Sequence, residues 1–96
     1  MGDEGCFGMS IEFPNPSRSY DETRHRVRFS GYDGTREILM FIEEAAIRHL
    51  DSGIGHKEGA ILQAFDRHRK RICEAAVTAY GRRRGSTCTL NTADVS

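Results

Sequence analysis

The feature that most constrains the fold is the dipeptide Asp33-Gly34, which separates two stretches rich in β-branched and aromatic residues. A type I′ hairpin turn needs positive φ at both central positions, and Asp-Gly tolerates that backbone. The sequence therefore predicts a β-hairpin over residues 26–42, with Asp33 and Gly34 as its two loop residues.

The turn also predicts which residues of the hairpin lie opposite one another. With that loop, Phe29 lies opposite Ile38. In the same register, Val27 lies opposite Met40. Because side chains alternate between the two faces of a strand, these four apolar residues share one face. We predict that this face packs on the core.

The other face of the predicted hairpin combines charge with apolar surface. Leu39 is predicted opposite Arg28, and Phe41 opposite Arg26. A strand that is apolar on both faces is expected inside the sheet, with its outer face at least partly covered. Three covers are open at this stage: the arginine stems, the N-terminal segment or a second copy of the protein. These two arginines, Leu39 and Phe41 are the candidate interface residues.

Helical spacing begins after the hairpin. The stretch EEAAIRHLDSG, residues 43–53, places acids in the first turn and a glycine just past the end, so it predicts a short helix. Residues 58–80 repeat apolar side chains at three- and four-residue steps, and Gly81 follows as a stop. They predict one long amphipathic helix. Residues 86–90 alternate in polarity and are a candidate final strand.

Together these elements predict a single α+β domain over residues 9–96, preceded by a disordered lead, residues 1–8. The predicted order is β-β-β-α-α-β. A small antiparallel sheet, made of a first strand around SIEF, the hairpin and the C-terminal strand, packs against two helices. Pro14 and Pro16 predict a connector between the first strand and the hairpin.

Four segments of the sequence resemble a known family. They are FPNPSRSYDETRHRVRFSGYDG, ILMFIEEAA, FDRHRKRICEAA and LNTAD. Over roughly residues 10–95 they resemble the small bacterial family catalogued as domain of unknown function 1488. The recognisable positions are core and turn residues: Val27, Phe29, Asp33-Gly34, Phe65, Ile72 and Ala76.

This resemblance implies a fold and no chemistry. It implies a compact α+β domain with an antiparallel sheet against two helices, and the family brings no established activity with it. Members typically begin near the position of Met9. Leu39 and Phe41 depart from the family pattern, because more polar residues are expected on the outer face of the sheet.

The overall composition is that of a soluble globular protein. Charged residues make up 29% and hydrophobic residues 38%, and no apolar run approaches the roughly 18 residues of a membrane span. The first 13 residues lack the basic and apolar regions of a signal peptide. We therefore expect a cytoplasmic protein without membrane contact. Three cysteines without a CxxC pair indicate neither a disulfide framework nor a zinc ribbon.

A group of bases lies along and after the long predicted helix. Such a patch can neutralise phosphates of a nucleic acid or another anionic ligand. However, Asp66 and Glu74 each lie four residues from Lys70, and the chain as a whole has no net charge. A solvated helix face is therefore favoured, and anion binding is the alternative. The candidate anion-binding residues are Arg67, Lys70, Arg71, Arg82, Arg83 and Arg84.

Catalytic and metal-binding motifs are not recognisable in the sequence. His68 and Cys73 are five residues apart, which places them on different faces of a helix. There is no dinucleotide-binding glycine motif, no phosphate-binding loop and no HExxH motif. We therefore expect no catalytic residues, no cofactor and no metal. The prediction is a non-enzymatic bacterial protein-interaction domain, with a second copy of itself as a candidate partner.

Overall fold

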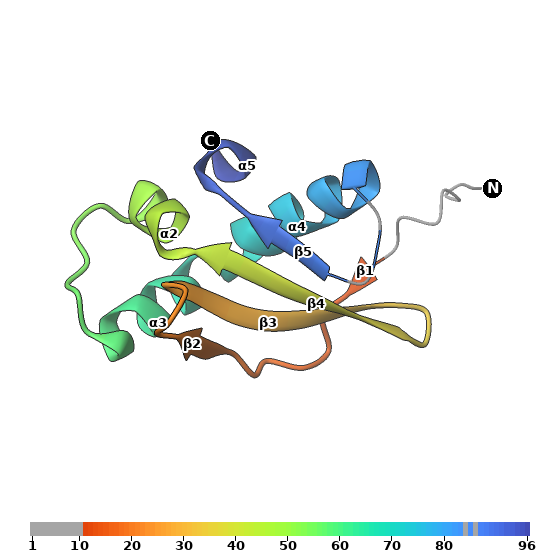
Figure 1. Ribbon diagram of the computed structural model, residues 1–96, viewed down its shortest axis with the longest axis horizontal. Coiled ribbons are helices and arrows are strands. Elements are labelled where there is room, and N and C mark those ends of the chain that lie inside the picture. The colour runs from red at the N-terminus through yellow and green to blue at the C-terminus, as the bar shows by residue number, and fades with distance from the viewer. Residues whose placement is uncertain (1–10, 84, 86) are drawn as a thin grey trace.

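The computed structural model describes residues 11–83, 85 and 87–96 as an α+β fold with one mixed sheet (Figure 1). The predicted lead, residues 1–8, lies outside the described residues. The strands are β1 (Ile11–Glu12), β2 (Ser19–Asp21), β3 (Arg26–Asp33), β4 (Arg36–Glu43) and β5 (Thr87–Leu90). The helices are α2 (Glu44–Leu50), α3 (Glu58–Arg67), α4 (Arg69–Arg83) and α5 (Thr92–Val95).

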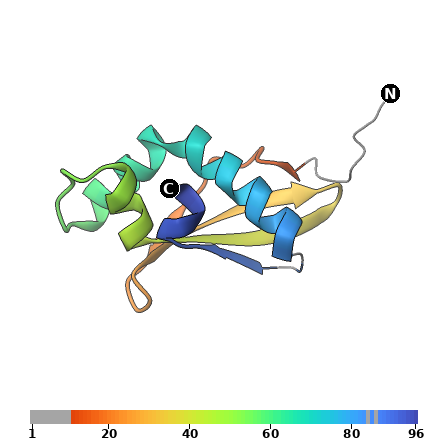
Figure 2. The ribbon, with the colours of Figure 1, turned by 90° about the horizontal axis from the view of Figure 1, so that it is seen from above.

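All four helices lie on one side of the sheet, as the edge-on view in Figure 2 shows. A sheet buries one face against helices when that face is apolar, and this face carries the alternating apolar residues of β3 and β4. The opposite side of the sheet has no helix against it among the described elements. We call this second side the outer face.

The hairpin forms, but its loop lies one residue later than predicted. Asp33 pairs with Arg36, so Gly34 and Thr35 are the loop residues. Gly34 has a φ of 67°, the left-handed backbone that a type II′ turn requires of its first central residue. The predicted pairs are therefore wrong by two residues. Phe29 lies opposite Met40, and Val27 lies opposite Ile42.

A register shift of two residues leaves every side chain on its predicted face. The predicted core face of the hairpin is therefore confirmed: Val27, Ile38 and Met40 are 0% exposed and Phe29 is 3% exposed.

The position of β4 in the sheet explains why it is apolar on both faces. The sheet order is β1-β3-β4-β5, with β2 also paired to β3, so β4 lies inside the sheet as predicted. The candidate final strand is confirmed as β5, but β5 runs parallel to β4. The predicted purely antiparallel sheet is wrong because three helices connect these strands, and such a crossover returns the chain in the same direction.

The long predicted helix over residues 58–80 is two helices, α3 and α4, separated at His68. The backbone of His68 has φ −109° and ψ 18°, outside the α-helical region. Its N–H still donates to the carbonyl oxygen of Ala64 at 3.1 Å, and its carbonyl oxygen accepts from the N–H of Ile72 at 2.9 Å. A kink of a single residue leaves the apolar spacing nearly in phase, so the pattern does not reveal it.

Two short elements lie where none was predicted. Strand β2 occupies the end of the predicted connector and pairs with the first residues of β3. Helix α5 follows β5 and begins with a capping box, in which the side chains of Asn91 and Asp94 each accept from the other residue's backbone N–H. The chain therefore has four described helices rather than two, and the predicted elements keep their order.

The core lies between the sheet and the helices. At its centre the rings of Phe29 and Phe65 are 5.1 Å apart, tilted by 60°. One buried cluster joins all three helical segments of the crossover to both long strands and to the C-terminal helix. Its members are Val27, Phe29, Ile38, Met40, Ile42, Ala46, Ile47, Ile61, Ala64, Phe65, Ile72, Ala75, Ala76, Ala79, Tyr80, Cys88, Leu90 and Val95.

The close approach of β1 to β3 depends on Gly31. A Cβ atom at Gly31 would lie 2.8 Å from Cε1 of Phe13 and 2.9 Å from Cγ2 of Ile11. We expect Gly31→Val to lower the free energy of unfolding by about 1–3 kcal/mol, because the new side chain must displace both neighbours. Urea denaturation measures this change. Ser30→Val, which adds bulk on the outer face, is the control, and an equal loss in both variants would contradict the packing argument.

Candidate functional site: the outer face of the sheet

The outer face is built from alternate residues of all five strands of the sheet. Partners across a ladder point to the same side of a sheet, so the pairing of each strand assigns its members. The face has a small apolar centre, with two bases and two acids toward one end and two acids toward the other. Its residues are Glu12, Ser19, Asp21, Arg26, Arg28, Ser30, Tyr32, Glu37, Leu39, Phe41, Glu43, Thr87 and Thr89.

Phe41 is covered by an arginine of the same chain. The guanidinium carbon of Arg26 lies 3.6 Å from the centroid of the Phe41 ring, and Phe41 is 9% exposed. Arg26 is held there by Asp21, whose Oδ2 accepts from Nε at 3.2 Å. This is a cation–π contact between diagonal neighbours, because Arg26 itself pairs with Glu43. Of the three covers considered from the sequence, an arginine side chain of the same chain covers this ring, with its guanidinium rather than its aliphatic stem over the ring.

Leu39 and its charged neighbours are less enclosed. Leu39 is half-buried, and Arg28 and Glu37 are exposed. Among the described residues, neither Arg28 nor Glu37 has a hydrogen-bonding or ion-pairing side chain beside it. The centre of the outer face is therefore an apolar side chain flanked by two opposite charges that no described residue neutralises.

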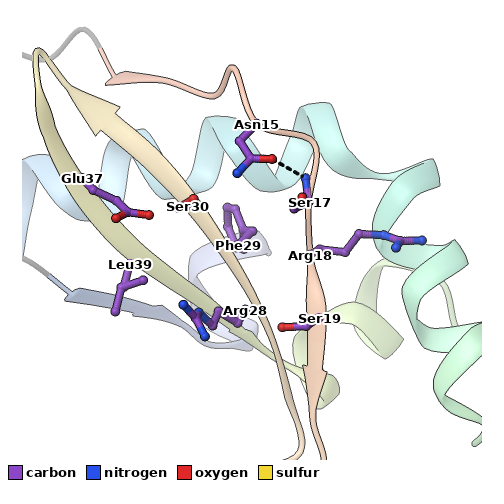
Figure 3. Close-up of a pocket in the computed structure, with 9 residues that line it drawn as sticks. All are labelled: Asn15, Ser17, Arg18, Ser19, Arg28, Phe29, Ser30, Glu37 and Leu39. Carbon is purple, nitrogen blue, oxygen red and sulfur yellow. Dashed lines mark hydrogen bonds between the residues drawn. The ribbon is translucent and has the colours of Figure 1, made fainter.

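Two hollows open on the outer face on either side of Arg28. The first, of about 190 Å³, is drawn in Figure 3 and lies between residues 15–19 and the strands β3 and β4. The second, of about 480 Å³, lies over Arg26, Leu39 and Phe41. Both are lined by Ser19, Arg28 and Leu39. The face is thus uneven, and Arg28 stands between its two depressions.

The first hollow coincides with an interruption in the edge of β3. Strand β2 pairs with residues 26–28 of β3 and β1 pairs with residues 32–33, which leaves residues 29–31 without a ladder partner on that edge. Arg18 points away from the hollow toward α3, as Figure 3 shows. Its guanidinium donates two hydrogen bonds to the carboxylate of Asp66, at 2.9 and 2.8 Å. Arg18 therefore does not supply a free charge to this site.

The candidate anion-binding residues are engaged in separate contacts. Arg67 donates to Asp51 at 2.6 Å, and this hydrogen bond lowers the pKa of the Asp51 carboxyl. Arg71 donates to the carbonyl oxygen of Val95 at 3.2 Å.

The bases near the end of α4 gather on Asp94, whose side chain is 4% exposed. Arg83 lies 2.8 Å from its carboxylate and Arg82 lies 3.8 Å from it. Lys70 is exposed and has no partner among the described residues. Arg84 lies outside the described residues. The structure therefore does not gather the described bases into one free patch.

A network of polar side chains that sequence analysis missed lies where β2, the following turn and α2 meet. The Tyr20 hydroxyl donates to Oε1 of Glu44 at 2.6 Å, and Arg48 donates to Oε2 at 2.8 and 3.0 Å. Nδ1 of His25 lies 3.3 Å from the Tyr20 hydroxyl. Arg48 also reaches the loop before α3, where it lies 3.0 Å from Nδ1 of His56.

The network fixes the protonation of its two central groups. The hydrogen bond to Glu44 raises the pKa of Tyr20 from 10.0 to about 12. The same hydrogen bond lowers the pKa of Glu44, helped by Arg48 and opposed by burial. His25 has a φ of 53°, a left-handed backbone rare outside glycine, and its carbonyl oxygen accepts from the N–H of Glu44 at 2.9 Å.

This network ties β2 to α2. Both carboxylate oxygens of Glu44 accept hydrogen bonds from the chain itself, Oε1 from Tyr20 and Oε2 from Arg48. A hollow of about 320 Å³ opens beside it, lined in part by Glu22, His56 and Glu58. The i,i+4 spacing of Glu44 and Arg48 could have indicated one ion pair on α2, but no local pattern links these residues to Tyr20, His25 and His56.

Metal and thiol chemistry find little support in the described residues. Within residues 11–83, 85 and 87–96, no group of three or more His, Cys, Asp or Glu side chains is arranged to hold a metal ion. Burial raises the pKa of the Cys73 thiol and of the Cys88 thiol, which disfavours the reactive thiolate. In the same part of the chain, no helix has both the length and the apolar character needed to cross a membrane.

Comparisons with known proteins agree with this architecture. A family model described as "Protein of unknown function (DUF1488)" matches residues 11–89. Among solved structures, the chain is similar to a protein of unknown function from the DUF1488 family of Shewanella loihica PV-4, with a TM-score of 0.75 and 18% identity. The alignment covers 85% of this chain and 92% of that one. No curated protein matches. At this identity the structural likeness supports the fold alone.

Proposed function

Because this chain belongs to the DUF1488 family of proteins of unknown function, as its sequence resemblance implied, we propose its role from its surface: a non-enzymatic interaction domain that pairs with a second copy through the outer face. The observation that carries the proposal is the centre of that face. Leu39 lies half-buried on a side of the sheet without a helix, between Arg28 and Glu37, which have no described partner.

The arrangement of the outer face resembles that of a protein contact surface. Such surfaces have an apolar centre, a polar rim and an enrichment in arginine and aromatic residues. Leu39 and the edge of Phe41 supply the centre, and Ser19, Thr87 and Thr89 lie at the rim. Because the Arg26–Phe41 contact is already made within the chain, this part of the face is preorganised and needs little reordering on association.

Binding of a nucleic acid or another polyanion by the bases of α3 and α4 has weaker support. A phosphate would have to compete with Asp51 for Arg67 and with Asp94 for Arg83, since each arginine already forms short hydrogen bonds to its carboxylate. Three exposed candidates lack a hydrogen bond to a carboxylate: Lys70, Arg71, which donates to the carbonyl oxygen of Val95, and Arg82, which lies 3.8 Å from Asp94.

The experiment is a measurement of mass by light scattering over a range of protein concentrations. We expect the wild-type chain to approach twice the mass of one chain, and Leu39→Asp to weaken the dimer by at least about tenfold, roughly 1.4 kcal/mol. Burying a carboxylate against the partner's apolar centre is the physical cause. Gln63→Asp is the matched control, because Gln63 is exposed on α3, on the helical side of the sheet.

Two results would contradict the proposal. One is a wild-type chain that stays monomeric at the highest concentration measured. The other is a dimer that Leu39→Asp leaves unchanged although circular dichroism shows the variant to be folded, which would place the contact elsewhere, for example on the outer edge of β5.

A further inference from the structure

We infer that the two copies are related by a two-fold axis that runs across the strands over Leu39, so that each Arg28 meets the partner subunit's Glu37. This inference rests on the proposed self-association and adds to it the orientation of the two copies. It follows from the places of three side chains in the β3–β4 ladder.

We call two residues that pair across β3 and β4 a row, and name each row by one of its members. Arg28 and Glu37 lie on opposite sides of the row formed by Leu39 and Ser30. Leu39 pairs with Ser30, whereas Arg28 pairs with Phe41 and Glu37 pairs with Tyr32. Same-face residues of a strand are two positions apart, or about 6.8 Å. The two charges therefore lie one such step from Leu39 in opposite directions along the strands.

Two sheets that meet through the same face are related by an axis lying in the plane between them. An axis across the strands, along the Leu39 row, stacks β4 on the partner's β4 and Leu39 on its own copy. It also brings the row of Arg28 opposite the partner's row of Glu37. Arg28 is on β3 and the partner's Glu37 is on β4, so the two charges are offset by one strand spacing, about 4.8 Å across the strands. Long side chains can bridge this offset.

The charges select this axis over the other in-plane choice. An axis parallel to the strands places each row opposite the same row of the partner. Arg28 then meets the partner's Arg28 and the partner's Phe41, and Glu37 meets the partner's Glu37 and the partner's Tyr32, so no opposite charges come together. With the axis across the strands, two ion pairs form and equal charges stay apart. The two Glu37 side chains are then separated by about 14 Å along the strands, more than the Debye length of about 8 Å at physiological salt.

The pairing can be tested by reversing its two charges. Arg28→Glu alone and Glu37→Arg alone each place like charges together twice in a homodimer, so each is expected to weaken self-association by more than tenfold. The chain carrying both substitutions restores the pairs and is expected to dimerise like the wild type.

Mixing the two single variants gives the sharpest readout. Every contact between Arg28→Glu and Glu37→Arg chains is again a pair of opposite charges, so native mass spectrometry should show mainly the heterodimer. Lys70→Glu and Glu74→Arg are the matched controls, because both residues are exposed on α4. These control variants should dimerise as the wild type does and show no preference for each other.

The outcomes separate the orientation from the proposed function. A dimer that Leu39→Asp disrupts, but whose reversed variants neither weaken nor prefer each other, overturns the Arg28–Glu37 pairing and leaves self-association through the outer face in place. A monomeric wild type, or a dimer insensitive to all three positions, overturns both. Mutual selection of the two single variants supports both.

Discussion

Phe65→Ala is expected to lower the free energy of unfolding by about 3–5 kcal/mol. Phe65 is 0% exposed, its ring packs at 5.1 Å on Phe29, and the guanidinium of Arg69 lies 4.8 Å from its centroid. Truncation leaves a cavity between the sheet and the α3–α4 kink that flexible neighbours cannot fill. Small domains have a total stability of about 5–15 kcal/mol, so much of the protein is expected to unfold in mild urea.

Two controls test whether the loss comes from the cavity. Phe65→Leu fills most of the volume and is expected to lose less than half as much. Leu62→Ala removes a side chain that is only partly buried on the same helix, so its cost should also be smaller. A loss below about 1 kcal/mol for Phe65→Ala would contradict the position of this ring at the centre of the core.

Glu44→Ala is expected to cost about 3 kcal/mol at neutral pH, the second largest effect. The substitution removes the acceptor of the Tyr20 hydroxyl and of two Arg48 donors, at 2.6, 2.8 and 3.0 Å. Hydrogen bonds to charged groups contribute about 1.5–3 kcal/mol each, and partial exposure reduces their sum. Urea denaturation of Glu44→Ala and of Glu58→Ala, an exposed acid in the first turn of α3, gives the comparison.

The same network gives stability a defined dependence on pH. The pKa of Glu44 is lowered from 4.5, so its contribution is present above that pH and is lost as the pH falls through the lowered value. The pKa of Tyr20 is raised from 10.0 to about 12, so its contribution is present below pH 10.0 and is lost as the pH rises toward 12.

The acid and alkaline limbs of this profile share the Tyr20–Glu44 hydrogen bond, so each substitution should flatten both in part. Glu44→Gln removes the titrating carboxyl and with it the main cause of the raised pKa of Tyr20, and Tyr20→Phe removes the titrating hydroxyl and with it the main cause of the lowered pKa of Glu44. If both variants keep the acid and alkaline limbs of the wild-type profile, other groups cause the pH dependence of stability.

Sequence patterns sufficed for the parts of the fold that depend on alternation. Val27, Phe29, Ile38 and Met40 all face the core as predicted, although their pairing shifted, because a shift of two residues preserves the face. The break at His68 was not predictable, since the apolar spacing continues across it. The direction of β5 was not predictable either, because it depends on how three helices pack rather than on the strand's own residues.

The surface was harder to predict than the core. The sequence identified Leu39, Phe41 and their arginines as neighbours on one face, but not that Arg26 lies over the Phe41 ring. It identified the bases of α3 and α4 but not their partners, since Asp51 is 16 residues from Arg67 and Asp94 is 11 residues from Arg83. Charge patterns along one helix report spacing within that helix, whereas these carboxylates reach it from other elements.

The parallel strand β5 has a consequence for the order in which the protein assembles. The β3–β4 hairpin pairs residues close in sequence and can form early, whereas β5 joins β4 only across a crossover of three helices. Leu90 and Val95, which complete the buried cluster, follow that crossover. Until the chain has been made through Val95, the inner face of β4 lacks part of its cover. Folding of this domain is therefore expected to finish at its C-terminal end, with the apolar hairpin exposed to aggregation until then.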